Sequence, residues 1–183
     1  TLFRSIPPVP SLFSLCLPGH PLNALMGTVV ENAVVGVPGT KMKADGPLLI
    51  THWGLSGPAV LKLSAYAARM LHENGYRCRI AINWFGEQKE HAVVRELQEL
   101  ALQHGQKQLQ SAYPSIFNAR LWRYLLACCK LRPDSRWGEL QPGTFVRMAA
   151  MLTNHMLDVD GKNRFKEEFV TCGGVALSNV DAS

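Results

Sequence analysis

The stretch at residues 46–61, GPLLITHWGLSGPAVL, constrains the fold of this chain more than any other. It begins with a short apolar run of strand length. Gly54 and Gly57 supply backbone conformations that other residues avoid. Ser56 or Gly57 can cap a helix, and Pro58 suits its first turn. The stretch therefore predicts a strand, a sharp turn and a helix start, whose free amide groups suit an anion or an electron-rich ring. The same residues would also make a plain, well-capped corner.

Strand-like runs surround this stretch and cover residues 11–17, 27–37, 40–44, 77–85 and 168–172. Several short strands at close spacing predict a barrel or a small sandwich. We expect the run at 40–44 to reverse at Asp45 and Gly46 into the central strand. The helix that starts at Pro58 should run to about Asn74, where Gly75 can end it in the left-handed conformation.

Between residues 87 and 162 the apolar pattern changes from strand spacing to helix spacing. Three apolar stripes predict three helices. Their members are Val93, Leu97, Leu100 and Ala101; Leu121, Trp122, Leu125, Leu126 and Cys129; and Phe145, Met148, Ala149 and Leu152. We expect a polar turn at residues 157–161. The predicted fold class is α+β, with a small β-barrel body at residues 1–86 and 163–183 and a helical insert at residues 87–162.

Composition places the chain among ordinary globular proteins. It has 183 residues, of which 47% are apolar and 18% are charged, enough to bury a substantial core. Its five cysteines are odd in number and form no C-x-x-C pair, which suits a reducing cytosol and argues against a disulfide framework or a zinc ribbon. Prolines interrupt the N-terminal stretch where a signal peptide would need a helix, and no apolar run has the length of a membrane span. We therefore expect a cytoplasmic protein without a membrane partner.

The charge balance raises nucleic acid as a candidate partner, since the net charge is +5 and the isoelectric point is near 9.1. The basic residues are scattered, however. Their densest group, at residues 120–136, is accompanied by Asp134 and Glu139 and has no aromatic ladder for base stacking. Nucleic acid is therefore disfavoured, although a small basic barrel that binds RNA remains an alternative.

Several motifs that would define a chemistry are missing or incomplete. Neither G-x-G-x-x-G after a predicted strand nor a Walker-type G-x-x-x-x-G-K-[ST] occurs, so both usual phosphate-binding loops are absent from the sequence. Residues 54–58 approach the G-x-S-x-G hydrolase motif, but Pro58 replaces the final glycine, so we interpret Ser56 as a helix cap and not as a nucleophile. The six histidines show no pair at metal-ligand spacing on one helical face, and no metal site is expected.

Four segments in this order carry a family resemblance: residues 6–12 (IPPVPSL), 46–61, 119–126 (ARLWRYLL) and 165–175 (FKEEFVTCGGV). Together they make the chain resemble the BaiN/YhiN-like bacterial flavoproteins, a family of NAD(P)/FAD-dependent oxidoreductases. The resemblance implies a β-barrel with a helical insertion, itself an insert of a Rossmann-like FAD-binding protein. In that family the dinucleotide-binding fingerprint precedes this region and a further flavin-contacting segment follows it. The chain therefore resembles the middle of such an enzyme.

The resemblance implies the substrate-side insert of a FAD-dependent oxidoreductase, with NAD(P)H as the candidate nicotinamide. We expect the isolated chain to be inactive and to bind no FAD alone, because the FAD-binding segments of the family lie outside it. The expected partners are the Rossmann-like FAD domain of the same polypeptide and a small-molecule substrate that the sequence does not identify. A protein–protein interaction domain, with an apolar groove on the helical insert, is a further alternative.

Two glycine corners, at residues 51–57 and 171–175, remain as candidate sites. The candidate catalytic residue is His52. The candidate cofactor contacts are Thr51, Trp53, Gly54, Ser56, Gly57, Thr171, Gly173, Gly174 and Val175. A Gly-Gly pair allows another backbone or a flat ring to approach closely, and the neighbouring threonine can bond to a polar ring edge. The alternative is that this glycine pair simply bends the chain as it leaves the barrel.

Overall fold

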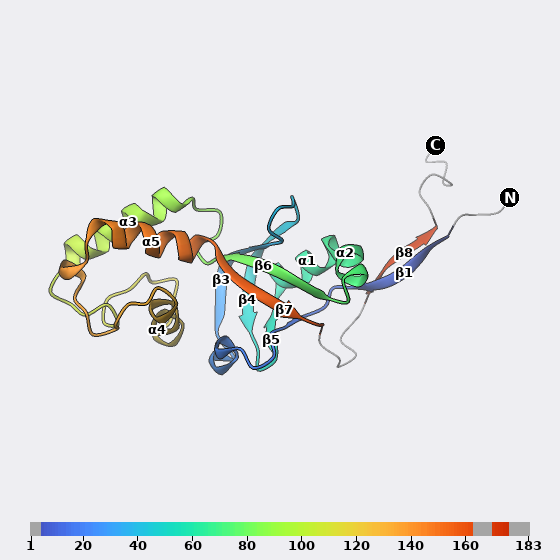
Figure 1. The fold of residues 1–183 in the computed structure, drawn as a ribbon, viewed down its shortest axis with the longest axis horizontal. Helices are drawn as coiled ribbons and strands as arrows, with labels where there is room; N and C mark the ends of the chain where they lie inside the picture. Colours follow the sequence, from blue (N-terminus) through green and yellow to red (C-terminus); the bar gives the residue numbers. More distant parts are fainter. Residues whose placement is uncertain (1–4, 163–169, 176–183) are drawn as a thin grey trace.

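The computed structural model describes residues 5–162 and 170–175 (Figure 1). Its strands are β1 (Ser5–Ser11), β2 (Leu15–Cys16), β3 (Val29–Gly36), β4 (Lys43–Ile50), β5 (Gly54–Ser56), β6 (Arg77–Asn83), β7 (His155–Asp160) and β8 (Val170–Val175). Its α-helices are α1 (Pro58–Tyr66), α2 (Ala68–Glu73), α3 (Glu90–His104), α4 (Ala119–Cys128) and α5 (Pro142–Thr153), with short 3-10 helices η1 (Pro21–Leu25) and η2 (Trp137–Glu139). The mixed helix and strand content predicted from the sequence is confirmed.

Six strands form one antiparallel sheet in the order β2-β5-β4-β3-β6-β7. The two edges of this sheet meet at one end, where Leu15 and Lys162 form an antiparallel bridge. Beside this bridge, the N–H of Cys16 donates to the carbonyl of Gly161 at 2.9 Å. The sheet therefore curls towards a barrel. Its inner face carries the core residues Val35, Leu48, Ile50, Ile80 and Ile82, all fully buried.

Strand β4 runs without a break through the predicted reversal at Asp45 and Gly46, so that prediction is wrong. The chain reverses earlier, between β3 and β4, where the N–H of Val37 donates to the carbonyl of Met42 at 2.9 Å. Gly46 has a φ of +134° and the register shifts between β3 and β4 beside it. The irregularity leaves Glu31 and Asn32 of β3 opposite Pro47 alone, and this proline has no N–H for the ladder.

The central turn leads into a short strand, β5, that the sequence did not predict. Leu55 of β5 pairs with Ile50 of β4 on one side and with Leu15 of β2 on the other. The helix that begins at Pro58 bends at Ala67 and is divided there into α1 and α2. The left-handed conformation predicted for Gly75 is confirmed by its φ of +61°.

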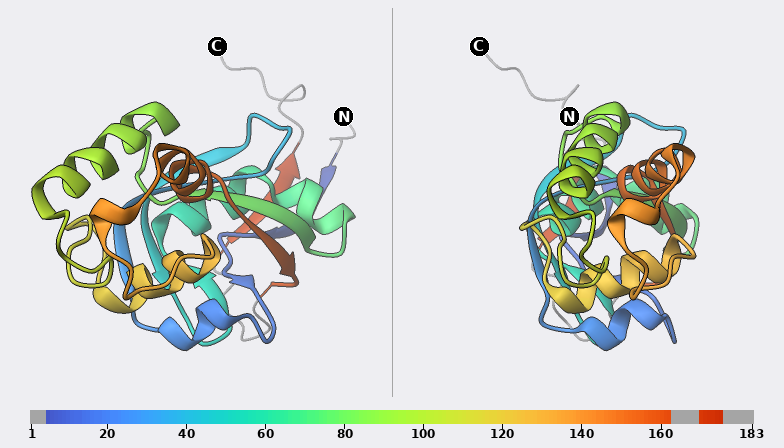
Figure 2. Two further views of the ribbon diagram at one scale, coloured as in Figure 1. Left: turned by 60° about the vertical axis from the view of Figure 1, so that its left-hand side comes forward. Right: turned by 90° about the vertical axis from the view of Figure 1, so that its left-hand side faces the viewer.

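The three predicted helices are present as α3, α4 and α5, and they gather at one end of the molecule (Figures 1 and 2). Their core is a row of nearly parallel aromatic rings. Trp122 stacks between Phe117 and Trp137 at centroid distances of 5.9 and 6.2 Å, and Trp137 stacks on Phe145 at 6.5 Å. The indole N–H groups of both tryptophans donate to backbone carbonyls, so these large side chains are buried without an unpaired donor.

The polar turn predicted at residues 157–161 is wrong, because strand β7 occupies most of this range and pairs with β6. Along β7 buried and exposed residues alternate, and the aspartates take exposed positions. Asp158 and Asp160 there form ion pairs of 2.8 Å with Arg79 and Arg77 of β6. The chain thus returns to the sheet inside the range 87–162 that we assigned to the helical insert.

Strands β1 and β8 form a separate two-stranded antiparallel ribbon at the end of the molecule opposite the helices (Figure 1). The sequence did not predict β1, because three prolines interrupt it; prolines are tolerated at a sheet edge, where no ladder N–H is needed. Of the strand predicted at 11–17, only Leu15–Cys16 forms the separate strand β2, and Ser11 ends β1. Of the strand predicted at 168–172, residues 168 and 169 lie outside the described residues.

Candidate functional site

The first glycine corner is a tight turn that joins β4 to β5. The N–H of Thr51 donates to the carbonyl of Gly54 at 2.8 Å, and the N–H of Gly54 donates to Oγ1 of Thr51 at 3.1 Å. Thr51 is buried, and these bonds employ both its amide and its hydroxyl oxygen. In this structure, therefore, Thr51 stabilises the conformation of the turn.

Both glycines of this corner lie against backbone of other strands. Gly54 has a φ of +153°, and a Cβ there would collide with the carbonyl oxygen of Leu15. Gly57 has a φ of +91°, and a Cβ there would lie 2.8 Å from the carbonyl oxygen of Pro47. Only glycine combines these conformations with such close approach. On these sides, the close approach that the two glycines allow is taken up by the protein's own backbone.

The start of α1 uses Gly57 as its N-cap, without a side-chain cap hydrogen bond. The interpretation of Ser56 as the helix cap is therefore wrong: its hydroxyl accepts a hydrogen bond of 2.8 Å from the hydroxyl of Ser14. A Cβ on Gly46 would lie 3.6 Å from the amide nitrogen of Ala59, so the first turn of α1 packs over the bulge of β4. On this side the amide end of the helix faces the strand below it.

His52 and Trp53 form the tip of the corner. Their rings meet edge to face, with centroids 4.3 Å apart. His52 is exposed, whereas Trp53 is partly buried and its carbonyl accepts from the N–H of Leu17 at 2.8 Å. Nε1 of Trp53 is buried and has no hydrogen-bond acceptor among the described residues. Leaving a buried N–H unpaired costs about 1–3 kcal/mol, so this donor marks the corner as a place for a further contact.

The second glycine corner lies inside strand β8. Thr171 pairs with Pro10, Gly174 with Ile6 and Val175 with Ser5. A Cβ on Gly173 would lie 2.7 Å from Cα of Pro8, so here too a glycine admits a neighbouring strand. A Cβ on Gly174 would meet no heavy atom within 4 Å, and Thr171 is exposed.

The structure places the two corners on different sheets. Residues 51–57 contain β5, which lies between β2 and β4 in the six-stranded sheet, and residues 171–175 belong to the two-stranded ribbon. Figure 1 shows β5 and β8 well apart. Within the described residues, therefore, the two corners do not converge on one cavity.

A buried polar cluster that the sequence analysis missed lies where the sheet meets α4. Nε1 of Trp84 donates to Nδ1 of His155 at 3.1 Å, and Oη of Tyr124 lies 3.5 Å from Nε2 of the same imidazole. Cys128 lies one turn further along α4 from Tyr124. Burial, followed by the nearby His20, lowers the pKa of His155 to about 4, so this imidazole is neutral at pH 7. Burial raises the pKa of Tyr124 and that of Cys128.

Sequence spacing could not reveal this cluster, because its members come from three distant segments. The cluster is not a metal centre: no three His, Cys, Asp or Glu side chains in the described part of the chain are placed to hold a metal ion. The helices carry a second feature, a pocket of about 360 Å³ between α3, η2 and α5. Its lining includes Leu140 and Phe145, and Leu102 at its rim is 86% exposed.

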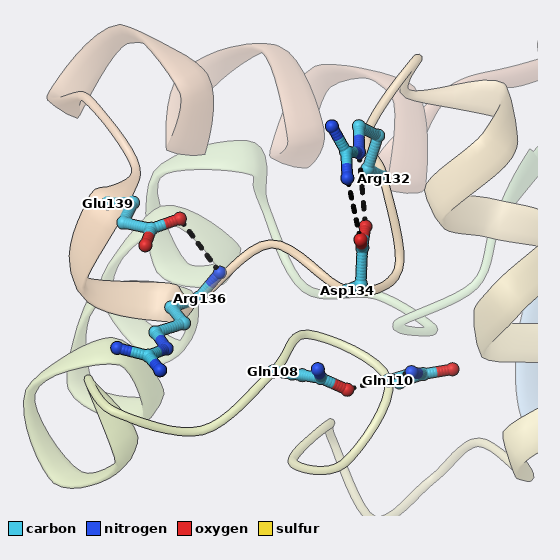
Figure 3. A network of polar contacts seen from close by, with 6 residues as sticks. All are labelled: Gln108, Gln110, Arg132, Asp134, Arg136 and Glu139. Carbon is cyan, nitrogen blue, oxygen red and sulfur yellow. Dashed lines mark hydrogen bonds and ion pairs between the residues drawn. The ribbon is translucent and has the colours of Figure 1, made fainter.

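Figure 3 shows two loops of the helical part, one with Gln108 and Gln110 and the other with Arg132, Asp134, Arg136 and Glu139. Gln108 and Arg136 form an antiparallel bridge, and the carboxylate of Glu139 accepts from the N–H of Arg136 at 3.2 Å. Arg132 forms an ion pair of 2.6 Å with Asp134. Part of the densest basic group is thus paired with acidic residues, which is typical of an ordinary mixed surface.

The architecture defines a class: a curled antiparallel sheet with a helical insert between β6 and β7, beside a separate ribbon in which the first and last described strands, β1 and β8, pair with each other. The chain belongs to the HI0933-like family, since the family model described as the HI0933-like protein barrel and H2TH domain matches residues 9–170. This confirms the resemblance to the BaiN/YhiN-like flavoproteins.

The 3-dehydro-bile acid delta(4,6)-reductase of Clostridium scindens is 24% identical to the chain over 176 residues. The match covers 95% of this chain and 43% of that relative, so the chain spans less than half of the relative's length. In the described ranges 5–162 and 170–175, no helix combines the length and the hydrophobicity needed to span a bilayer.

Proposed function

We propose that this chain is the substrate-side insert of a FAD-dependent oxidoreductase and is not catalytic by itself. The pairing of β1 with β8 carries this proposal. Ser5 lies opposite Val175, so both ends of the described chain leave the body side by side. An inserted domain needs adjacent ends, because the host domain must continue where it was interrupted. The partial match to the reductase supports the same arrangement.

The corner at residues 51–57 fits a flavin-facing role. The buried N–H of Trp53 has no acceptor among the described residues, and a flavin ring offers carbonyl and ring-nitrogen acceptors. When bound, FAD would supply the transfer of a hydride between a nicotinamide, NAD(P)H, and the substrate. This chain would contribute the indole donor of Trp53 and the exposed imidazole of His52, held in place by the turn between Thr51 and Gly54. The ribbon glycines, Gly173 and Gly174, would connect the insert to the host domain.

The name of the relative favours a reductase that acts on a small organic substrate. A visible absorption titration with FAD tests the proposal, performed on this chain and on a longer protein that includes the flanking flavin-binding segments. We expect only the longer protein to hold FAD. The proposal fails if the longer protein binds no flavin.

A protein-interaction domain is a second candidate, favoured by the pocket on the helical part and by the exposure of Leu102. It predicts self-association that depends on concentration and needs no cofactor, measured by sedimentation. Replacing Leu102 with Ser should abolish it. RNA binding has less support, because Arg77, Arg79 and Arg132 are each paired with an aspartate.

A further inference from the structure

We infer that Trp84, His155 and Tyr124 form a one-directional hydrogen-bond chain that locks α4 onto the sheet, and that protonation of His155 opens this joint. The inference concerns how the helical insert is held and does not depend on the proposed flavin chemistry. Trp84 directly follows β6 and His155 begins β7, so both belong to the sheet side of the joint. Tyr124 and Cys128 lie four residues apart on α4 and therefore on one face of that helix.

The direction of the hydrogen-bond chain follows from the chemistry of its first member, the indole of Trp84. An indole nitrogen can only donate, so Nδ1 of His155 must be the unprotonated acceptor. A neutral imidazole carries one proton, which must then be on Nε2, facing Oη of Tyr124 at 3.5 Å. Oη of Tyr124 accepts this hydrogen bond, so its own proton points away from Nε2 of His155. One tautomer of His155, with its proton on Nε2, therefore satisfies every hydrogen bond in this series.

Because both residues are buried, the protonation state of His155 decides whether its hydrogen bond with Trp84 can form. Trp84 is 0% exposed and His155 is 8% exposed, so neither can turn to water when its partner is lost. An imidazolium carries N–H groups on both nitrogens. Protonation would therefore place the N–H at Nδ1 of His155 against the N–H of Trp84, two donors in a buried contact.

The surroundings of His155 do not compensate a positive charge. The titratable groups that face it are Tyr124 and Cys128 from α4 and His20 from the turn before η1. No carboxylate of the described residues acts on its pKa, and His20 opposes a second positive charge. Movement of Tyr124 and α4 away from the sheet would let water reach the imidazolium, which otherwise stays buried and uncompensated.

The opening should be confined to the C-terminal half of α4. The first turn of α4 has separate anchors on the sheet side. The side chain of Asn118 donates to the hydroxyl of Thr28 at 3.2 Å, and Arg120 donates to the carbonyl of Ala24 at 2.6 Å. These contacts contain no group that titrates near His155. We therefore expect residues 124–129 to loosen first.

Two variants and a control test the joint. His155→Asn keeps an acceptor near the position of Nδ1 but cannot be protonated, and Tyr124→Phe removes only the hydroxyl. Tyr113→Phe is the matched control, because Tyr113 stacks on Trp122 at 6.3 Å in the same helical part without joining the chain. The readouts are the tautomer of His155, from the nitrogen NMR shifts of the imidazole, and amide exchange of residues 124–129 between pH 7 and pH 4. Exchange is corrected for its intrinsic pH dependence and compared with that of β3 and β4.

We expect the Nε2–H tautomer in the unmodified chain and a loss of protection of about tenfold for each pH unit below the pKa of a free imidazole, down to the pKa of His155. Tyr124→Phe should show raised exchange already at pH 7, Tyr113→Phe should not, and His155→Asn should remove the pH step. An Nδ1–H tautomer, or a pH step of the same size in His155→Asn, would overturn the inference. Exchange of residues 124–129 that is no faster than that of β3 and β4 at every pH would also overturn it, because global unfolding alone would then explain the change.

Discussion

Trp84 donates a hydrogen bond of 3.1 Å to His155 across 71 positions of the chain. The backbone N–H of Trp84 also donates to the carbonyl of Leu152 at 3.0 Å. The end of β6 and the start of β7 are therefore tied together, and the helical insert enters and leaves the sheet at one point. The ribbon of β1 and β8 ties the outer ends of the described chain in the same way.

Acid should destabilise the protein through His155. Its folded pKa, about 4, lies below the ordinary value of 6.5, so the unfolded chain binds more protons between these values. Stability is unaffected by this group above pH 6.5 and falls as the pH drops towards 4, by at most about 3 kcal/mol. Urea denaturation of the unmodified chain and of His155→Asn at several pH values measures this. The difference between the two should shrink as the pH falls; a constant difference would contradict the prediction.

Gly54→Ala should be among the most damaging small substitutions in the chain. An alanine Cβ would collide with the carbonyl oxygen of Leu15, and the φ of +153° is unfavourable for any side chain. We expect a loss of roughly 3 kcal/mol or more, measured by thermal or urea denaturation. Gly39→Ala is the control, because Gly39 has a φ of +76° and a Cβ there would meet no heavy atom within 4 Å. It should cost only about 1 kcal/mol of backbone strain. Equal losses would show that the contact with β2 is unimportant.

Trp53→Phe separates the indole N–H from the bulk of the ring. In this chain the variant removes a buried donor without an acceptor among the described residues, so its stability should stay the same or rise by up to about 1 kcal/mol. In the longer protein the same variant should weaken FAD binding by roughly tenfold, the value of one hydrogen bond to a flavin acceptor. Denaturation and flavin titration measure the two effects. Destabilisation of this chain with unchanged flavin affinity would contradict the proposed contact.

His52→Ala should leave the fold intact, because His52 is exposed. In the longer protein we expect it to slow electron transfer between flavin and substrate by roughly 10²-fold, if the imidazole moves a proton there. Stopped-flow flavin absorbance measures this step. His91→Ala, at an exposed position in the first turn of α3, should have no effect. Equal rates for the unmodified protein and His52→Ala would exclude His52 as the catalytic residue.

Local periodicity was a sound guide to much of the fold. The alternation in residues 77–85 predicted β6, and the apolar stripes predicted α3, α4 and α5. Pro58 begins α1 and Gly57 caps it, as the turn chemistry indicated. These features depend on residues within a few positions of one another, so the sequence carries them directly.

The missed strands depend on partners that are distant in the chain. Strand β5 has only three residues and is defined by its pairing with β4 and β2 on either side. In β7, Asp158 and Asp160 indicated a turn, but Arg79 and Arg77 on β6 make their positions suitable for a strand. Cross-strand pairs of this kind cannot be inferred from spacing within one segment.

The features of the candidate site divide in the same way, into those that the sequence predicts and those that depend on tertiary packing. The sequence by itself determined the corner that leads into α1, the three helical stretches of the insert and the left-handed glycine at residue 75, because backbone sterics and side-chain period are local properties. Only the tertiary structure decided that Gly54 and Gly173 admit neighbouring strands, that Trp53 keeps a buried donor, and that His155 meets Trp84 and Tyr124. These relationships arise from the packing of segments far apart in the chain, which sets burial and hydrogen-bond partners.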